Sequence, residues 1–411
     1  MHLAGLTSQH VGFCASGGLD SRTLTKKFVE LGVKVTCFTA DLGQPDEIDI
    51  GQIKTRMAAC GADTVLVDLK APMAEACFEV LQALAMYDGG YWNSTGIARA
   101  VTVKGLLPVM QQHGCGVLAH GATGRGNDQM RFERYTNVLA PAMKVYAPWR
   151  DPELLKEFPG RTQMAAYLTR FGLPVPKGHR KQYSTDSNLA GLSHEAEDLE
   201  SLETAMTIVQ PTMGVWPAAA PDKAEKIALR FEHGRCVAID GRPVTPLEAM
   251  QTANQRAGRN GIGLKHALEN RIIGTKSRGV YEAPGMELLG AGLRYVYQAV
   301  MDRRSTLLFQ QLSKLVADQI YDGRYFDPVT RAAQAAIAVW TAYATANVTL
   351  EMYKGNLHFL SLTDCRASLY NEADSSMEAS DGLNPVSSQG FAEIQSVEAL
   401  ALARAGQISK Q

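Results

Sequence analysis

The sequence predicts an α/β protein in which a parallel-sheet domain is followed by an α+β domain and a single C-terminal helix. Three observations support this prediction. Strand-like and helix-like segments alternate regularly from residue 11 to 121, hairpin patterns replace them in the second half, and an amphipathic helical pattern follows a polar stretch near the end. We therefore expect domains at residues 1–172 and 173–385, and the final helix at residues 386–411.

The first domain is predicted from four short apolar strands, expected at residues 11–14, 33–39, 64–69 and 117–120. Helical spacing between them is shown by Leu24, Phe28 and Leu31, by Ile50, Ile53 and Met57, and by Met73, Cys77, Val80 and Leu84. Because the strands are continuously apolar, both faces of their sheet should be buried. A parallel sheet of this kind binds ligands at the carboxyl ends of its strands.

The second half is expected to contain two β-hairpins with helices between them. Ile227, Leu229 and Phe231 alternate with polar residues, and the alternation resumes at 237–239 after the turn at His233-Gly234. A second hairpin is expected over residues 348–353 and 357–362, and helices over 308–320 and 332–340. Near the end, a terminal helix with one apolar stripe is predicted by Phe391, Ile394, Val397 and Leu400. Such a helix is more often a subunit clasp or a lid on the core than a binding motif.

Charge and cysteine content exclude several classes of function. The formal net charge of the 411 residues is −1, so the chain has no overall basic excess with which to bind nucleic acid. Its seven cysteines form no CxxC pair and no zinc-site spacing, which indicates thiols in a reducing compartment. No apolar run approaches the roughly 20 residues of a membrane helix, and the start of the chain lacks a signal-peptide pattern. We expect a cytoplasmic protein without nucleic-acid or membrane partners.

The strongest local motif is the segment Cys14 to Ser21, which lies between the first predicted strand and the first predicted helix. Paired glycines allow the backbone to approach a ligand, and the amides at the start of the helix point at the same place. A Walker loop would need a lysine where Leu19 stands. The SGGxDS pattern instead resembles the phosphate loop of ATP pyrophosphatases, although a glycine-rich turn without a ligand remains an alternative.

A second polar cluster, Gly121 to Glu133, follows the strand that ends at His120. Thr123, Asn127, Asp128 and Arg131 place donors, acceptors and both charges within one short loop and turn, which suits a zwitterionic ligand. A solvated polar loop would account for the same residues.

Three further segments, 183–188, 193–195 and 269–282, mix hydroxyls, carboxylates and guanidinium groups. Taken singly, each is explained by helix capping or surface salt bridges.

Taken in order, these segments resemble the argininosuccinate synthase family, and the resemblance extends from Ser16 to about Tyr370. The matching motifs are SGGLD, TADLGQPDE, HGATGRGNDQMRFE, APWRDPE, YSTDSN and ENRIIGTKSRGVYEAPG. Within the family, QPDE, YSTDSN and HEAEDLE are similar to the longer bacterial branch. Several motifs in the same order are far more specific than any one of them.

The resemblance implies an ATP-dependent ligase of arginine biosynthesis that joins L-citrulline to L-aspartate and releases AMP and pyrophosphate. The ureido oxygen of citrulline would attack the α-phosphorus of MgATP, and the amine of aspartate would then displace AMP from the citrullyl-adenylate. No protein nucleophile is required, and the sequence shows no Ser-His-Asp or Cys-His signature. The implied fold is an N-terminal nucleotide-binding domain of the ATP pyrophosphatase (adenine nucleotide α-hydrolase-like) type, then an α+β synthetase domain and an oligomerisation helix. The implied assembly is a homotetramer.

The resemblance also implies a role for each matching residue. ATP would be held by Ala15, Ser16, Gly17, Gly18, Leu19, Asp20, Ser21, Ala40, Gly121, Thr123 and Asp186, with Asp20 a candidate ligand of Mg²⁺. Aspartate would be held by Thr123, Asn127 and Asp128. Citrulline would be held by Tyr91, Asn127, Arg131, Ser184, Ser193, Glu195, Glu269 and Tyr281. The catalytic candidates are Asp128, which could also accept a proton from the aspartate ammonium, and Arg131, which would pair with the citrulline carboxylate.

Two residues depart from the family pattern. Arg22 stands where the family usually has a small residue after the phosphate loop, so it could add a phosphate contact, point to solvent or crowd the site. Gly96 stands where relatives carry Ser or Pro beside the citrulline site, and a missing side chain there would remove a contact or widen the pocket.

Alternatives from other classes remain open at this point. A tRNA-modifying or glutamine-using ATP pyrophosphatase is disfavoured by the net charge of −1 and the unpaired cysteines. A non-catalytic citrulline or nucleotide sensor is encouraged only by Arg22, and a ligase for another ureido compound only by Gly96.

Overall fold

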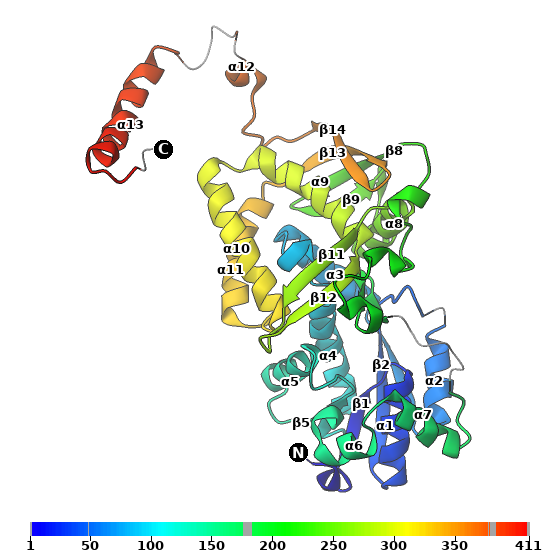
Figure 1. The fold of residues 1–411 in the computed structure, drawn as a ribbon. Coiled ribbons are helices and arrows are strands. Elements are labelled where there is room, and N and C mark those ends of the chain that lie inside the picture. The colour runs from blue at the N-terminus through cyan, green and yellow to red at the C-terminus, as the bar shows by residue number, and fades with distance from the viewer. Residues whose placement is uncertain (1, 48, 176–182, 377, 379–383, 409–411) are drawn as a thin grey trace. The chain divides into compact units, whose positions relative to one another are not determined.

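The computed structural model describes residues 2–47, 49–175, 183–376, 378 and 384–408. The chain divides into two compact units, Met1–Arg366 and Ala367–Gln411, and the first contains all of the strands described below (Figure 1). The boundary expected near residue 172 lies inside the first unit and stays a prediction.

The N-terminal part of the first unit is built on a parallel sheet, as the sequence predicted. Its strand order is β3-β2-β1-β4-β5, and every neighbouring pair is parallel. The strands are β1 (His10–Cys14), β2 (Lys34–Asp41), β3 (Thr64–Asp68), β4 (Val117–His120) and β5 (Lys144–Tyr146). The sequence analysis missed β5, because three residues are too few to show a pattern. The chain builds outward from β1 to β3 and then returns to the other side of β1, so the order reverses between β1 and β4.

Seven α-helices accompany this sheet. They are α1 (Leu19–Glu30), α2 (Gly51–Ala58), α3 (Lys70–Gln82), α4 (Ser94–Gln112), α5 (Asp128–Leu139), α6 (Pro152–Glu157) and α7 (Arg161–Arg170). The helical spacing had indicated α1, α2 and α3 correctly. Strand β1 separates two layers of helices, since Gly12 faces Met110 of α4 while Val11 and Phe13 belong to the core on the side of α1.

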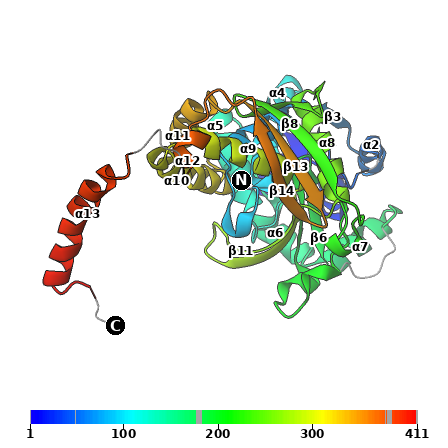
Figure 2. The ribbon, with the colours of Figure 1, turned by 90° about the horizontal axis from the view of Figure 1, so that it is seen from above.

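Both predicted hairpins are present and belong to one five-stranded antiparallel sheet with the order β10-β9-β8-β13-β14. The strands are β8 (Glu225–Glu232), β9 (Arg235–Ile239), β10 (Arg242–Pro243), β13 (Ala346–Tyr353) and β14 (Asn356–Thr363). Figure 2 shows β8, β13 and β14 side by side. Ile227, Leu229 and Phe231 are buried, as their alternation predicted. Helices α8 (Pro246–Arg259) and α9 (Pro284–Val300) pack against this sheet.

A third sheet was not predicted. It has the order β11-β12-β7-β6 and consists of β6 (Ser184–Asn188), β7 (Gly191–Glu195), β11 (Leu264–Asn270) and β12 (Lys276–Glu282). The sequence analysis explained these polar segments by capping and surface salt bridges, and this was wrong. Ser193 lies in strand β7 and does not open a helix. Polar residues hid the strands because one face of this sheet carries hydroxyls and carboxylates where a core would carry apolar residues.

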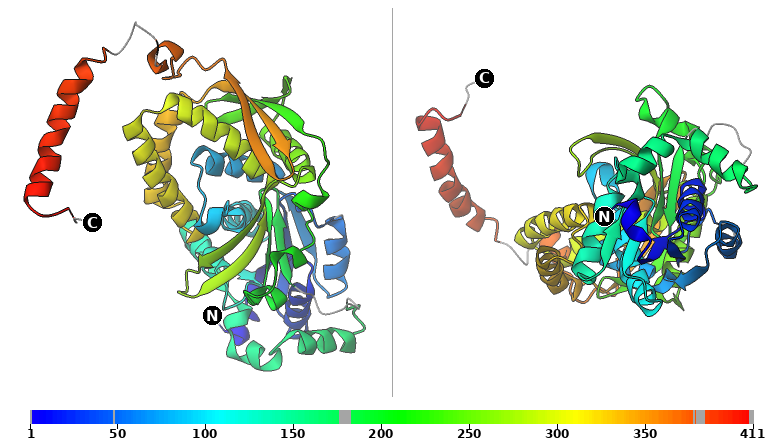
Figure 3. Two further views of the ribbon diagram at one scale, coloured as in Figure 1. Left: turned by 45° about the horizontal axis from the view of Figure 1, so that its top comes forward. Right: turned by 90° about the horizontal axis from the view of Figure 1, so that it is seen from below.

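Two further helices of the first unit confirm the predicted helical segments of the second half. They are α10 (Arg303–Tyr321) and α11 (Pro328–Thr341), and they lie side by side (Figure 3). Short 3-10 turns occupy Leu3–Leu6, Asp88–Gly90, Pro148–Arg150, Glu197–Glu200, Met206–Ile208 and Pro217–Ala219. Among the described residues, every helix is too short or too polar to cross a membrane.

The second unit contains α12 (Glu372–Ser375) and the predicted terminal helix, α13 (Ser387–Arg404). The last residues of the expected segment, 409–411, lie outside the described part of the chain. Nothing else described in this unit covers the apolar stripe of α13, whose members are Phe391, Ile394, Val397 and Leu400.

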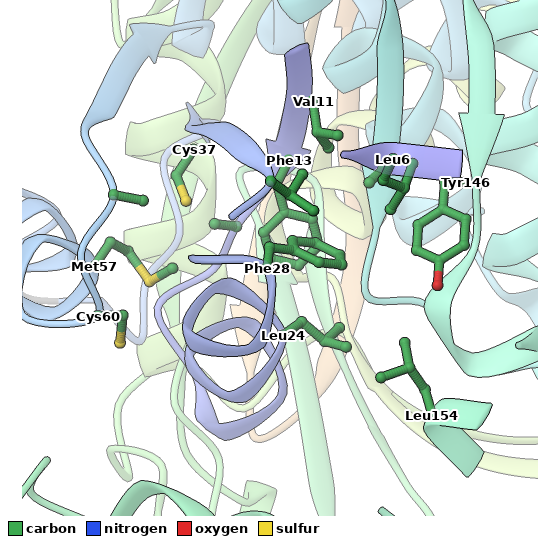
Figure 4. Close-up of a cluster of buried hydrophobic side chains, with 14 of the residues drawn as sticks. Leu6, Val11, Phe13, Leu24, Phe28, Cys37, Met57, Cys60, Tyr146 and Leu154 are labelled. Atoms are coloured by element: carbon green, nitrogen blue, oxygen red, sulfur yellow. The ribbon is translucent and has the colours of Figure 1, made fainter. Parts of the chain in front are cut away.

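The core beside the parallel sheet joins β1 to α1, α2 and α7 (Figure 4). Phe13 of β1 and Phe28 of α1 make an edge-to-face contact with ring centroids 5.7 Å apart. Both rings are fully buried, so α1 is held firmly against β1. This packing fixes the position of the loop between them, which contains the SGGLD motif.

Candidate active site

The two glycine-rich loops emerge at the same edge of the parallel sheet. Strands β1 and β4 are neighbours, with Cys14 opposite His120 in the register. The loop after β1 and the loop after β4 therefore start next to each other at the carboxyl ends of the strands. This is also the point where the strand order reverses, which is where open α/β sheets bind ligands.

The loop after β1 has a backbone geometry that suits an anion. Gly17 has a φ of +71°, which favours glycine, and Gly18 caps α1 without a side chain that could occupy the first helical amides. The hydroxyl of Ser21 accepts a hydrogen bond from the Ser16 amide at 3.1 Å and lies 3.2 Å from the Ser16 hydroxyl. Thr39 ties the loop to β2 by donating to the Ala15 carbonyl at 2.7 Å. Ala40 lies near the end of β2 and is buried.

The second polar cluster is only partly a loop. Residues 121–127 are irregular, but Asp128 begins α5, so Asp128 and Arg131 lie on the first turn of a helix and not on a solvated loop. Gly124 allows a close approach, because a β-carbon there would lie 2.9 Å from the Trp149 carbonyl oxygen. The helix therefore carries two side chains that the sequence analysis had placed in a short loop and turn.

Asp128 lies between two guanidinium groups. Its Oδ1 accepts from Arg131 Nη1 and its Oδ2 from Arg99 Nε, each at 2.9 Å. Arg99 also donates from Nη2 to Asp186 Oδ2 at 2.7 Å. The sequence analysis missed Arg99, which joins a carboxylate of α5 to one of β6. Asp128 and Asp186, 58 positions apart in the sequence, are thereby linked through one side chain.

The surroundings of Asp128 argue against the expected role as a proton acceptor. Burial raises the pKa of its carboxyl group, but the charges of Arg99 and Arg131 together outweigh burial and lower the pKa below its usual value. A carboxylate with a lowered pKa is a weak base. Asp128 is instead suited to attract and orient an ammonium group.

Strand register places six of the predicted residues on one face of the four-stranded sheet. Ser184 pairs with Glu195, Asp186 pairs with Ser193, and Ser193 pairs with Tyr281. Directly paired residues share a face, and so do residues two apart on a strand. Glu269 lies on the same face, because it pairs with Ser277, which is four residues from Tyr281 on the same strand. This face is Ser184, Asp186, Ser193, Glu195, Glu269 and Tyr281.

Four tyrosines border this face. The rings of Tyr91 and Tyr281 stack with centroids 4.0 Å apart, and those of Tyr87 and Tyr321 with centroids 3.8 Å apart. Tyr91 is fixed further, because its hydroxyl accepts from the Thr95 amide at 2.8 Å. The sequence analysis named Tyr91 and Tyr281 and missed Tyr87 and Tyr321, which belong to none of the motifs.

Two carboxyl groups of this face are poor acids. Burial raises the pKa of Glu269 to about 7, although Tyr321 and Arg131 act in the opposite direction. Burial also raises the pKa of Glu195, although half of its side chain is exposed and the Arg271 guanidinium lies 3.7 Å away. A site with these groups binds an ammonium ion best when they are ionised.

Arg22 has none of the three consequences considered from sequence. Its side chain is buried and donates from Nη2 to the backbone carbonyl of Pro174 at 2.5 Å. The guanidinium thus anchors the segment after α7 to α1 and does not reach into the phosphate loop, point to solvent or crowd the site.

Replacing Arg22 by alanine is expected to destabilise the protein and to leave the KM for ATP nearly unchanged. A charge-assisted hydrogen bond and buried packing are lost, so we expect a decrease of about 1.5–3 kcal/mol in the free energy of unfolding. Urea denaturation and ATP titrations measure the two quantities. Arg170→Ala, at an exposed arginine of α7, is the control. A raised KM for ATP with unchanged stability would return Arg22 to the phosphate site.

Gly96 does not widen a pocket. A β-carbon at this position would lie 3.0 Å from the Ile320 carbonyl oxygen and 3.3 Å from Ile320 Cγ2. Gly96 is the residue at which α4 approaches the end of α10, and the expectation of a wider citrulline site was wrong. The departure therefore does not support a different ureido substrate.

Two cavities lie away from these residues. One of about 280 Å³ is lined by α3 and α11, including Glu79 and Arg331. Another of about 230 Å³ lies between the loop after β2 and α8, including Pro45 and Gln251. Neither is lined by a predicted site residue, so the charged cluster around Arg99 and Asp128 is the better candidate for chemistry.

Comparisons with known proteins agree with the sequence motifs. Residues 10–174 match the family model described as arginosuccinate synthase N-terminal HUP domain, and residues 183–402 match the arginosuccinate synthase C-terminal domain. The chain is also similar to the argininosuccinate synthase of Rhodopirellula baltica, with 39% identity over 383 residues that cover 92% of this chain and 94% of that protein.

Proposed function

This chain belongs to the argininosuccinate synthase family, whose members are ATP-dependent ligases of citrulline and aspartate. On that basis we propose which of its residues hold each substrate. The observation that carries the proposal is the Arg99 bridge. It joins Asp128, beside the loops at the β1 and β4 ends, to Asp186 on the polar sheet face. The three substrates must lie close together to react, and residues that connect these loops with the sheet face are suited to hold them there.

We propose that ATP lies at the ends of β1 and β4. Its phosphates fit the amides of the loop after β1 and of the start of α1. The residues proposed to hold ATP are Ala15, Ser16, Gly17, Gly18, Leu19, Asp20, Ser21, Ala40, Gly121, Thr123 and Asp186.

Mg²⁺ is proposed to accompany ATP as part of the substrate. No cluster of three or more metal-ligating side chains occurs among the residues that the structure describes. Mg²⁺ commonly takes only one or two protein carboxylates together with phosphate oxygens. The single carboxylate of Asp20, on the first turn of α1, fits that need. The ion would neutralise charge on the phosphates, and Asp20 would help to hold it.

The two amino acids are proposed to bind on either side of the Arg99 bridge. Aspartate is assigned to Thr123, Asn127 and Asp128, with its ammonium group against the Asp128 carboxylate. Citrulline is assigned to Tyr91, Asn127, Arg131, Ser184, Ser193, Glu195, Glu269 and Tyr281. Arg131 uses three of its five N–H donors on Tyr321 and Asp128, which leaves two for the citrulline carboxylate among the described contacts.

The proposed chemistry needs positioning and charge stabilisation and no protein nucleophile. The citrulline ureido oxygen forms a bond to the α-phosphorus as the bond to pyrophosphate breaks. The aspartate ammonium loses a proton to solvent water, the free amine attacks the ureido carbon, and the bond between that carbon and the oxygen of AMP breaks. In this scheme Asp128 and Arg131 hold the two zwitterions so that nitrogen and carbon face each other, and the amides of α1 stabilise phosphate charge.

Pyrophosphate release from MgATP tests this function. It should require both citrulline and aspartate, and the product should have the mass of argininosuccinate. Release without citrulline, or nucleotide binding without release, would contradict the proposed substrates and favour a different acceptor or a sensor.

We also propose a cytoplasmic homotetramer. Six of the seven cysteines, Cys14, Cys37, Cys60, Cys77, Cys115 and Cys236, are free thiols, which fits a reducing compartment. The uncovered apolar stripe of α13 fits a second copy of the chain as its partner.

Removing residues 386–411 is therefore expected to yield smaller assemblies, because the stripe would no longer join subunits. Sedimentation velocity measures the change. A Phe391→Ser, Val397→Ser variant should give the same shift while keeping the helix length. An unchanged sedimentation profile for both variants would show that α13 is not the clasp.

A further inference from the structure

Tyr321 lies beside three residues of the proposed citrulline site, Asn127, Arg131 and Glu269, although no sequence motif includes it. It is the last residue of α10 and is 1% exposed. Its ring stacks on Tyr87, and the guanidinium of Arg131 lies 5.0 Å from the ring centroid. A buried tyrosine at a helix end beside an arginine and a glutamate can act through both its carbonyl and its hydroxyl.

The backbone carbonyl of Tyr321 orients Arg131. It accepts from Arg131 Nε at 2.9 Å and from Nη2 at 2.7 Å. The third contact of Arg131, from Nη1 to Asp128, leaves one N–H on Nη1 and one on Nη2, the two nitrogens that share the outer edge of the guanidinium, for a ligand. Because the fork is planar and rigid, two bonds to one carbonyl set the direction of that edge.

The hydroxyl of Tyr321 orients two more side chains. It accepts from Asn127 Nδ2 at 2.8 Å, and it faces the carboxyl group of Glu269, whose pKa it lowers. Asn127 is held from its other end, since its Oδ1 accepts from the Ile272 amide at 3.0 Å. A phenol has a single proton to donate, so with Asn127 as the donor the proton of Tyr321 goes to Glu269.

We propose that Tyr321 is a positioning residue for citrulline, with a carbonyl that aims Arg131 and a hydroxyl that holds Asn127 and the carboxylate of Glu269. The inference rests on the proposed citrulline site and adds a residue to it. Tyr321 thereby adds the end of α10 to a site that is otherwise built from the turn before α4, the start of α5 and the polar sheet face.

The hydroxyl also has a measurable electrostatic effect on Glu269. The groups that face Glu269 are Tyr321 of α10, Arg131 of α5, Glu195 of β7, Arg271 after β11, and Tyr87 and Tyr91 before α4. Burial raises the pKa of Glu269 to about 7, and the hydrogen bond from Tyr321 works against that rise. Without the hydroxyl, the pKa should rise further.

Tyr321→Phe tests the proposal, because it keeps the ring, the stack and the carbonyl and removes only the hydroxyl. In the wild type, kcat/KM for citrulline should fall as pH decreases through about 7, since a protonated Glu269 binds an ammonium group poorly. In the variant this acidic limb should move upward by roughly half a pH unit or more. At pH 7, kcat/KM for citrulline should fall by roughly 3- to 10-fold while the KM for ATP changes less than about twofold.

Two further variants separate the inference from the proposed site. Tyr87→Phe removes a hydroxyl from the same stack, but that hydroxyl donates to the Asn270 carbonyl, so the acidic limb should not move. Glu269→Gln should remove the limb near pH 7, because that limb belongs to Glu269 and any dependence on Glu195 stays in place. A limb that survives in Glu269→Gln would overturn the assignment of Glu269. The limb could instead be lost in Glu269→Gln and stay in place in Tyr321→Phe, with both variants shown to be folded by circular dichroism. That result would overturn the role of Tyr321 alone.

Discussion

Replacing Asp128 by alanine is expected to abolish argininosuccinate formation and to leave ATP binding nearly intact. The carboxylate is the proposed contact of the aspartate ammonium, and it also neutralises Arg99 and Arg131, which lie 2.9 Å away. Without it, two adjacent guanidinium groups would repel the incoming ammonium. A misplaced amine alone commonly costs about 10²-fold, so with the repulsion we expect a loss of about 10³-fold or more in kcat/KM for aspartate.

Calorimetric titration with a non-hydrolysable ATP analogue measures the retained affinity, and product analysis by mass measures turnover. Glu133→Ala is the matched control, because Glu133 lies on the same helix but forms an exposed pair with Arg150. Asp128→Asn keeps the volume and removes the charge, so it should also lose turnover. Unchanged product formation in Asp128→Ala would remove Asp128 from the site.

Replacing Arg131 by alanine should raise the KM for citrulline more than any other change to the citrulline site. The lost contact is a guanidinium fork to a carboxylate, in which each charge-assisted hydrogen bond is worth about 1.5–3 kcal/mol. Two such bonds correspond to an increase of roughly 10²-fold or more in KM. In Arg131→Ala, Asp128 keeps its contact with Arg99, the one close guanidinium that remains among the described residues. The KM for aspartate should therefore change less than the KM for citrulline.

Initial rates at varied citrulline, aspartate and ATP separate these effects. Arg134→Ala is the matched control, because Arg134 lies on the same helix and pairs with Asp327 away from the polar face. Arg131→Lys should restore little, since an ammonium cannot make the two-pronged contact. An effect confined to ATP would contradict the citrulline assignment. Asp128 and Arg131 form an ion pair with each other. The double variant should therefore lose less transition-state stabilisation, measured from kcat/KM, than the sum of the losses in the two single variants.

Local patterns in the sequence were enough to predict much of the fold. The first strand, the phosphate loop and α1 follow one another within 21 residues, so their geometry depends on neighbours along the chain. The two hairpins of the antiparallel sheet were predicted because each pairs residues that are close in sequence and alternate in polarity. Short or polar strands such as β5 and β6 carried no such pattern and were missed.

The candidate site depended on contacts between distant parts of the chain. Ordered motifs named most of its residues through their resemblance to a family, but periodicity could not bring them together. Ser184 and Glu269 share a face only because of the register of strands separated by about 80 residues, and Arg99 connects α5 with β6. No local spacing encodes such pairings.

Burial and charge environment likewise came from tertiary structure. From the sequence, Arg22 was expected to contact phosphate, point to solvent or crowd the site. In the fold its side chain is buried and bonds to the backbone carbonyl of Pro174. Asp128 and Glu269 are both carboxylic acids, yet two guanidinium groups lower the pKa of one and burial raises the pKa of the other to about 7. A side chain's chemistry is set by the groups that surround it in space, whereas the strands and helices that carry it follow from the spacing of apolar residues along the chain.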